Sequence, residues 1–224
     1  MAIKICPQVY QVGGADLSHA DDCCVYLVES EQGCVLIDAG AGRGTQRIIG
    51  NIKKLGFQPE QVSYLILTHG HIDHIGGAKQ LQEQTGAKVV AHELELDAIV
   101  NGNPQLTAAS WYGVRYQPVQ ADLVISKDKE TLTLGDVELV FLHTPGHTPG
   151  SISVLCTCAG IKVLFGQDIH GPFNREWGSD LIKWRNSMQK LISMDADVLC
   201  EGHFGVYQPA DKVRQYIESY LRRY

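Results

Sequence analysis

The sequence predicts an α/β protein with an αββα sandwich, in which two β-sheets pack face to face and helices cover their outer faces. Apolar runs of strand length fall into two groups, one in each half of the chain. Helical patterns accompany both groups, at 44–55 and 77–85 in the first half and at 181–194 and 210–223 in the second. Because every sheet face and helix stripe that is apolar must be buried, two sheets that each carry helices are expected to stack as four layers.

The first half contains the pattern of a hairpin followed by two further strands. Apolar runs at 25–28 and 34–37 flank the polar turn at 31–33, which ends in glycine, and this predicts a β-hairpin. Runs at 64–67 and 88–91 are the next two strands. Helical segments separate these strands, which is typical of strand–helix–strand units.

The helices of the first half are indicated by spacing and by stop signals. Between 44 and 55, Ile48 and Ile52 lie four positions apart on one helical face. The helix at 77–85 is followed by Gly86, a residue that commonly ends helices.

Residues 101–121 interrupt this alternation of strands and helices. The segment is rich in glycine and proline and includes Trp111, Tyr112 and Tyr116. Irregular excursions of this kind often cover a site, so one interpretation is a lid. The other is a surface insertion whose aromatic side chains pack against the domain.

The second half is rich in strands, and a Gly135-Asp136 turn separates two of them. Its two helices come after most of these strands, as expected for helices that cover one outer face. The expected strands lie at 123–125, 131–134, 137–142, 151–156, 162–165 and 198–200.

Length, charge and cysteine content narrow the class of protein. At 224 residues, one domain spanning 1–224 is expected. A net charge of -6 argues against a nucleic-acid partner and against a polybasic membrane anchor, and no apolar run approaches the length of a membrane span. No signal peptide is visible, and the seven cysteines form no C-x-x-C pair. These features predict reduced thiols and a cytoplasmic location.

The stretch at 68–74, Thr-His-Gly-His-Ile-Asp-His, is the most informative part of the sequence. Imidazole nitrogens and carboxylate oxygens are the ligands that zinc and related divalent metals prefer. In an extended turn His69 and His71 project to the same side, and Asp73 and His74 lie further along. One segment can therefore face two adjacent metal ions.

One segment cannot complete two coordination shells, so further ligands are expected at the ends of other strands. His147 follows the strand at 137–142, and Asp168 follows the strand at 162–165. His203 follows the strand at 198–200. The repeated order of strand, small residue and ligand favours their convergence on one rim.

These motifs, taken in order and with Leu-Ile-Asp-Ala-Gly at 36–40 upstream, resemble the metallo-β-lactamase superfamily over residues 24–205. Thr-Pro-Gly-His-Thr-Pro-Gly-Ser at 144–151 and an aspartate at 168 are similar to its glyoxalase II-like branch. Glyoxalase II has an additional C-terminal helical domain, whereas this chain ends about twenty residues after His203. The resemblance therefore implies a stand-alone domain.

The resemblance implies a site for two divalent metal ions, with zinc favoured and iron or manganese as further candidates. Asp38 would be a buried carboxylate near the site. One metal would be held by His69, His71 and His147 and the other by Asp73, His74 and His203, with Asp168 bridging the two.

Such a site implies a hydrolase of a small-molecule thioester, ester or lactone, in which a metal-bound hydroxide attacks the carbonyl carbon. Asp73 is also expected to carry a proton to the leaving group, because it would lie beside the bridging solvent. The alternative is a mononuclear iron oxygenase similar to the persulfide dioxygenases, with iron on His69, His147 and Asp168. The sequence leaves the substrate and the oligomeric state open.

Overall fold

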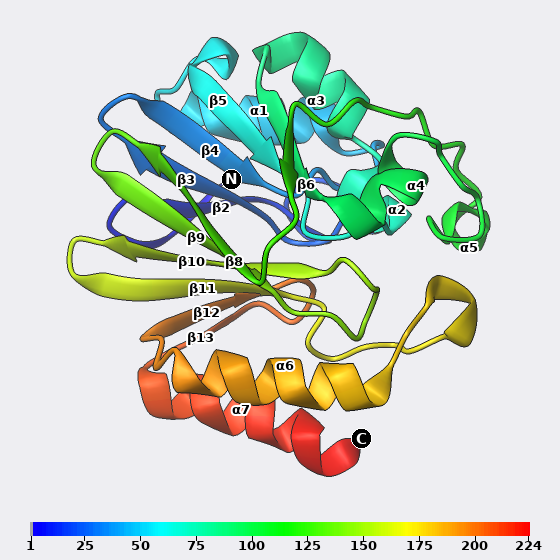
Figure 1. Ribbon diagram of the computed structural model, residues 1–224. Helices are drawn as coiled ribbons and strands as arrows, with labels where there is room; N and C mark the ends of the chain where they lie inside the picture. The colour runs from blue at the N-terminus through cyan, green and yellow to red at the C-terminus, as the bar shows by residue number, and fades with distance from the viewer. Residues whose placement is uncertain (1) are drawn as a thin grey trace.

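The computed structural model describes residues 2–224 and shows two sheets packed face to face between two layers of helices (Figure 1). The predicted αββα sandwich is therefore confirmed. The first sheet has the order β1 (Ile3–Cys6), β2 (Val9–Gly13), β3 (Val25–Ser30), β4 (Gly33–Ile37), β5 (Val62–Ile66), β6 (Lys88–His92), β7 (Leu123–Ile125). The second has the order β13 (Val206–Tyr207), β12 (Val198–Glu201), β11 (Ile161–Gln167), β10 (Ile152–Cys158), β9 (Val137–His143), β8 (Lys129–Leu134).

Long helices cover the outer faces of the sheets, and one-turn helices lie at one end of the sandwich (Figure 1). The covering helices are α1 (Thr45–Lys54) and α3 (Ala78–Thr85) on the first sheet, and α6 (Leu181–Ser193) and α7 (Ala210–Arg223) on the second. The one-turn helices are α2 (Ile72–Ile75), α4 (Leu96–Ile99) and α5 (Ala109–Tyr112). Within residues 2–224, none of the helices is long and apolar enough to cross a membrane.

Three apolar clusters account for the four layers. One lies between α1, α3 and the first sheet and includes Ile48 and Ile52, as their spacing predicted. A second fills the space between the sheets, and a third includes Trp184 and Ile217, which pack α6 and α7 on the second sheet. Burial of these side chains is the main force that holds the layers together.

The sequence analysis did not identify β1 and β2. Strand β1 is the edge of the first sheet, and its first residues Ile3 and Lys4 are exposed, so it has no continuous buried run. In addition, residues 72–75 form α2, so Asp73 and His74 lie in a helical turn rather than in an extended one.

Strand direction places the ends of several strands at one rim. β4, β5 and β6 are parallel, so their carboxyl ends share an edge of the first sheet. In the second sheet β9 and β11 are both antiparallel to β10, and β12 is parallel to β11. The loops that follow β9, β11 and β12 therefore also leave the sheet at a common edge. Open α/β sheets usually bind their ligands beyond the carboxyl ends of their strands.

Candidate metal centre

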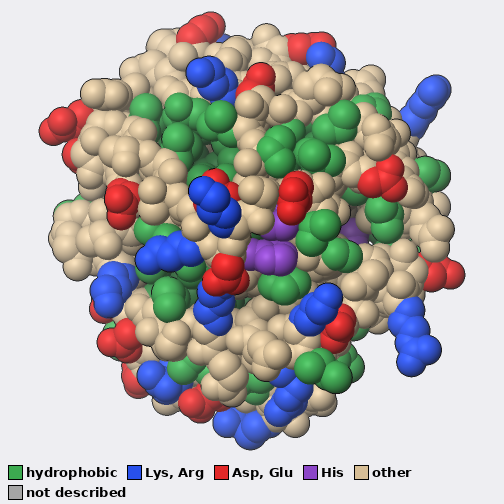
Figure 2. Space-filling view, in the orientation of Figure 1, with side chains coloured by type: hydrophobic (Ala, Val, Ile, Leu, Met, Phe, Trp, Pro, Cys, Tyr) green, Lys and Arg blue, Asp and Glu red, His purple; other side chains and the backbone are tan. Residues whose placement is uncertain are grey.

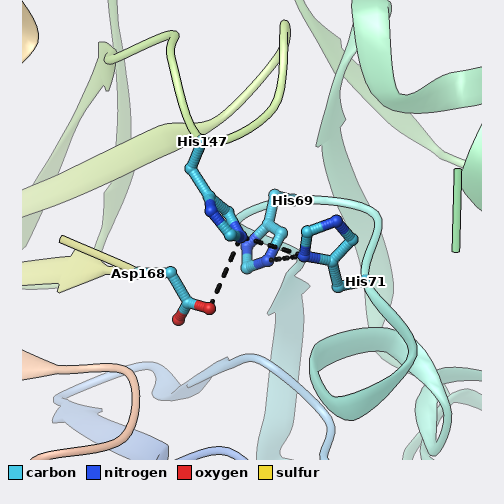
Figure 3. A group of neighbouring side chains, drawn as sticks. All are labelled: His69, His71, His147 and Asp168. Carbon is cyan, nitrogen blue, oxygen red and sulfur yellow. Dashed lines mark hydrogen bonds and ion pairs between the residues drawn. The ribbon is translucent and has the colours of Figure 1, made fainter. Parts of the chain in front are cut away.

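Three imidazoles form the first group of potential metal ligands. His71 Nδ1 lies 3.1 Å from His69 Nε2 and 2.9 Å from His147 Nε2. All three side chains are buried, and Figure 3 shows them converging from two separate loops. Ligands that share a tetrahedral zinc ion at 2.0–2.1 Å would lie roughly 3.4 Å apart, so these nitrogens are close to the spacing that one ion requires.

The second group contains one carboxylate and two imidazoles. His203 Nε2 lies 3.2 Å from Asp73 Oδ2 and 3.3 Å from His74 Nε2. Asp73 and His74 belong to α2, whereas His203 follows β12 in the other sheet. The three residues could therefore hold a second metal ion between the sheets.

Asp168 lies between the two groups. Its Oδ2 is 3.5 Å from His147 Nε2, while its Oδ1 is 3.1 Å from His74 Nε2 and 3.4 Å from His203 Nε2. Among residues 2–224, no group makes a hydrogen bond of suitable direction to Oδ1, although the atom is buried. A buried carboxylate oxygen without a donor is costly, and a cation bound beside it would remove that cost. The donor set and this oxygen fit a pair of divalent metal ions.

The first group is electrostatically suited to bind a cation. Burial, reinforced by the neighbouring imidazoles, keeps the pKa of His69 well below its usual value. Burial and then His147 lower the pKa of His71 to about 3, and burial lowers that of His147 to about 4. These imidazoles are therefore neutral at pH 7, the form that binds metals.

In the second group, neighbouring charges outweigh the effect of burial on the pKa values. Burial alone would lower the pKa of His203, but Asp168 and Asp73 raise it to about 10. Burial would raise the pKa of Asp73, but His74 and His203 lower it to about 2. Positive charge is therefore strongly favoured at this position between two buried carboxylates.

Hydrogen bonds orient two of these imidazoles from behind. Asp38 Oδ2 lies 2.8 Å from His74 Nδ1, so His74 Nε2 is directed at the second group. Thr68 donates from its backbone N–H to Asp38 Oδ1 at 2.8 Å, and its hydroxyl lies 3.2 Å from His69 Nδ1. Partners of this kind fix ring orientation in metal sites. Asp38 is buried near the site as expected, and its carboxylate contacts a histidine.

Glu95 is a buried carboxylate that the sequence analysis missed. It lies after β6 and accepts hydrogen bonds from Gly70 N–H and Gly150 N–H, both at 2.7 Å, and from the Thr148 hydroxyl at 2.6 Å. Burial raises its pKa, and these three hydrogen bonds oppose that shift. Glu95 thus connects the loop of His69 and His71 to the loop of His147. No motif in the sequence marks it, because its partners, two backbone N–H groups and one threonine hydroxyl, come from distant segments.

Glu201 supports the second group in a similar way. It is buried and accepts hydrogen bonds from the N–H groups of His203 at 2.6 Å and Phe204 at 2.8 Å. Its other oxygen lies 2.8 Å from His170 Nδ1. The only signal in the sequence was the position of Glu201 at the end of a strand, two residues before His203.

A cavity of about 280 Å³ opens over both groups. His71, Asp73, Asp168 and His203 contribute to its floor, and the segment 101–121 contributes part of its wall. The lining residues outside the two groups are Ala108, Trp111, Tyr112, His170, Pro172, Trp177 and Phe204.

Segment 101–121 was interpreted either as a lid or as an insertion with packed aromatic side chains, and its aromatic residues show both arrangements. Trp111 is 64% exposed and lies against Trp177, with ring centroids 4.8 Å apart. Tyr112 also lines the cavity. Tyr116 instead packs into the first apolar cluster and donates its hydroxyl to Ile99 O at 2.9 Å.

Comparison with known proteins agrees with this fold. The family model described as the metallo-beta-lactamase superfamily matches residues 20–203. Over 132 residues the chain is 36% identical to the probable metallo-hydrolase YqgX of Bacillus subtilis, an alignment that covers 57% of each chain. Over 133 residues it is 29% identical to the hydroxyacylglutathione hydrolase GloC of Haemophilus influenzae, covering 59% of each. The chain thus aligns with less than two thirds of either relative.

A solved structure extends the likeness in fold to the whole chain. A HARLDQ-motif mutant of a metallo-beta-lactamase from Cronobacter sakazakii superposes with a TM-score of 0.84 at 24% identity. The superposition covers 100% of this chain and 94% of that one. The chain belongs to the metallo-beta-lactamase superfamily.

Proposed function

We propose that this protein is a two-metal hydrolase that cleaves a small thioester, ester or lactone. The observation that carries the proposal is the position of Asp168, whose two oxygens face two separate groups of donors. The cavity gives a substrate access to both groups at once. The similarity to the probable metallo-hydrolase YqgX and to the hydroxyacylglutathione hydrolase GloC supports hydrolysis as the reaction class.

Zinc is the proposed metal, because imidazole and carboxylate donors in small clusters suit it. Iron and manganese accept the same donors. Two such ions, when bound, would acidify a shared water and polarise the carbonyl oxygen of the substrate.

The residues of the chain would orient the substrate and move the proton. Water attacks the carbonyl carbon, and the bond from that carbon to the leaving oxygen or sulfur breaks. Asp73, which lines the cavity floor, takes the proton from water at a carboxylate oxygen and passes it to the leaving group. Burial and then the Asp73 carboxylate raise the pKa of Tyr112, so its hydroxyl stays protonated and can donate a hydrogen bond in the cavity.

The alternative, a mononuclear iron oxygenase, would use His69, His147 and Asp168 alone. Such an enzyme does not need a second donor group. Here the donor atoms of Asp73, His74 and His203 lie within 3.8 Å of one another. This second group favours the two-metal proposal.

Metal analysis combined with activity tests the proposal. We expect two zinc ions per chain after reconstitution, and hydrolysis of simple thioesters or esters that a chelator abolishes and zinc restores. One iron per chain, with oxygen consumed in the presence of a persulfide and no ester or thioester cleaved, would overturn the proposal in favour of the oxygenase.

A further inference from the structure

The walls of the cavity differ in character from its floor. Trp111, Tyr112, Trp177 and Phe204 present aromatic rings above the metal-binding groups. Trp177 also lies edge-on to His71, with ring centroids 4.5 Å apart, so the aromatic wall reaches down to the proposed ligands. A substrate whose carbonyl reaches the floor would therefore place its neighbouring atoms against aromatic rings.

On the basis of the proposed hydrolase function, we infer that the substrate is uncharged and carries an apolar group about the size of one aromatic ring, bound against Trp111 and Trp177. Aromatic side chains favour such a group through area burial and ring stacking.

The charge of the lining argues against an anionic substrate arm. Among the residues that line the cavity, all within the described part of the chain, none is lysine or arginine. Its two acidic residues, Asp73 and Asp168, belong to the metal-binding groups. The basic side chains of the lining are histidines: His71 and His203 belong to the proposed metal-binding groups, and His170 Nδ1 lies 2.8 Å from Glu201. A carboxylate on the substrate arm would therefore be buried without a lysine or arginine partner, which is costly. On the face that Figure 2 shows, lysine and arginine side chains are dispersed among acidic ones rather than gathered at one place.

Exposure and backbone strain mark the mouth of the cavity as a binding surface. Trp111 is 64% exposed and Phe204 is 57% exposed, and both line the same cavity. Single exposed apolar residues are ordinary, but apolar side chains that adjoin at a concave surface often mark a ligand site. Ala108, which lines the cavity and precedes α5, has a φ of 51°. Strain of this kind in a residue without a glycine's freedom is frequent where a segment is held for function.

The size of the cavity limits the apolar group. A volume of about 280 Å³ is at the low end for small-molecule pockets. A cavity of about 150 Å³ can hold benzene, so this cavity has room for one ring beside the scissile bond.

Matched thioesters test the inference by kinetics. S-methyl thioacetate has no ring, benzyl thioacetate has a ring on the thiol, and S-methyl phenylthioacetate has a ring on the acyl group. With rates divided by those of hydroxide-catalysed hydrolysis, we expect at least one ring-bearing thioester to exceed the ring-free one about tenfold in kcat/KM. Adding a para-carboxylate to that ring should abolish the gain.

Variants locate the effect on the cavity wall. Trp111→Ala should raise KM about tenfold for the preferred ring-bearing thioester, equivalent to about 1.4 kcal/mol, and should raise KM for the ring-free thioester by a much smaller factor. Ile182→Ala is the matched control, because Ile182 is 75% exposed and lies outside this cavity. Ile182→Ala should leave KM unchanged for both thioesters.

A binding measurement separates this inference from the hydrolase proposal. The ketone 4-phenyl-2-butanone is an uncleavable analogue of benzyl thioacetate, and 2-butanone is its ring-free counterpart. We expect only the first to change tryptophan fluorescence saturably, with Kd about tenfold higher in Trp111→Ala. Hydrolysis with equal kcat/KM for neutral, ring-free and carboxylated substrates would overturn the inference and leave the hydrolase proposal standing. Ketone binding without hydrolysis of any thioester or ester would overturn the hydrolase proposal and leave the aromatic binding site standing.

Discussion

Asp168 is the residue at which the two proposed metal-binding groups meet. Its carboxylate directs one oxygen to His147 and the other to His74 and His203. Two divalent ions held ~3.5–4 Å apart repel each other strongly, and a carboxylate between them offsets that repulsion. The charge of Asp168 should therefore matter more for the pair of ions than for either ion alone.

Asp168→Asn tests this role while preserving the shape of the side chain. We expect the affinity for the first zinc ion to fall modestly and the affinity for the second to fall by a larger factor, measured by titration against a chromophoric chelator. Asp97→Asn is the control, because the Asp97 carboxylate accepts hydrogen bonds from the side chains of Asn101 and Asn103 and belongs to neither proposed metal-binding group. Two unchanged and equal affinities in Asp168→Asn would rule out a bridging carboxylate.

His71 and His203 test the assignment of ligands to the two groups. Each of the variants His71→Ala and His203→Ala should lose about one metal ion per chain and most hydrolytic activity. Both should remain folded, because the donors lie on loops outside the three apolar clusters. Elemental analysis measures the metal content, and circular dichroism shows whether the variant is folded. His19→Ala, in the N-terminal part of the chain, should keep full metal content, and full content in either ligand variant would show that the assignment is wrong.

At the scale of elements, the strand-then-ligand pattern made most of the site predictable. His147, Asp168 and His203 each follow a strand, and β9, β11 and β12 run in one direction, so the pattern in the sequence corresponds to one rim in space. The edge strand β1 was missed because its exposed residues do not form a buried run.

What the sequence could not reveal depends on contacts between distant segments. Glu95 joins the loops at 68–74 and 144–151 through backbone N–H groups, which carry no sequence signature. The role of segment 101–121 was also ambiguous, because a lid and an insertion with packed aromatic side chains have the same amino-acid composition. Trp111 is exposed at the cavity while Tyr116 is buried, and only the fold separates them.

Glu95→Gln tests the link between the two loops. The glutamine amide would present a donor where Glu95 accepts from Gly70, or from Gly150 and Thr148, so at least one buried hydrogen bond is lost. The unmatched group should cost about 1–3 kcal/mol of unfolding free energy. Zinc affinity should fall more at the group of His69, His71 and His147 than at the other.

The neighbouring residue Glu93 provides a matched control for this experiment. Glu93 lies in the same short helical turn, Glu93–Glu95, but is exposed. Glu93→Gln should leave stability and metal affinity unchanged. If Glu95→Gln lowered stability but left both zinc affinities as they are in the wild type, Glu95 would have a structural role only.

At the scale of the whole molecule, the proposed metal-binding groups lie where the two sheets meet. The first sheet supplies residues 69–74 and the second supplies His147, Asp168 and His203. Each proposed ion would therefore have ligands from both sheets and would hold the sheets together at this end. The second apolar cluster fills the rest of the space between the sheets, and hydrogen bonds such as the one from the Tyr26 hydroxyl to Glu201 O also join them.

Removal of metal should accordingly lower thermal stability without unfolding the protein. An ion that binds only the native state stabilises it by about 2.7 kcal/mol when its free concentration is a hundred times Kd. For a chain of this size that corresponds to a rise in Tm of roughly 5–10 °C. We expect a chelator to lower Tm by about this amount for each ion removed, zinc to restore it, and circular dichroism at 25 °C to stay unchanged. The double variant His71→Ala/His203→Ala should show a much smaller response to zinc. A Tm equal with and without chelator, in protein shown to bind zinc, would mean that the ions do not join the two sheets.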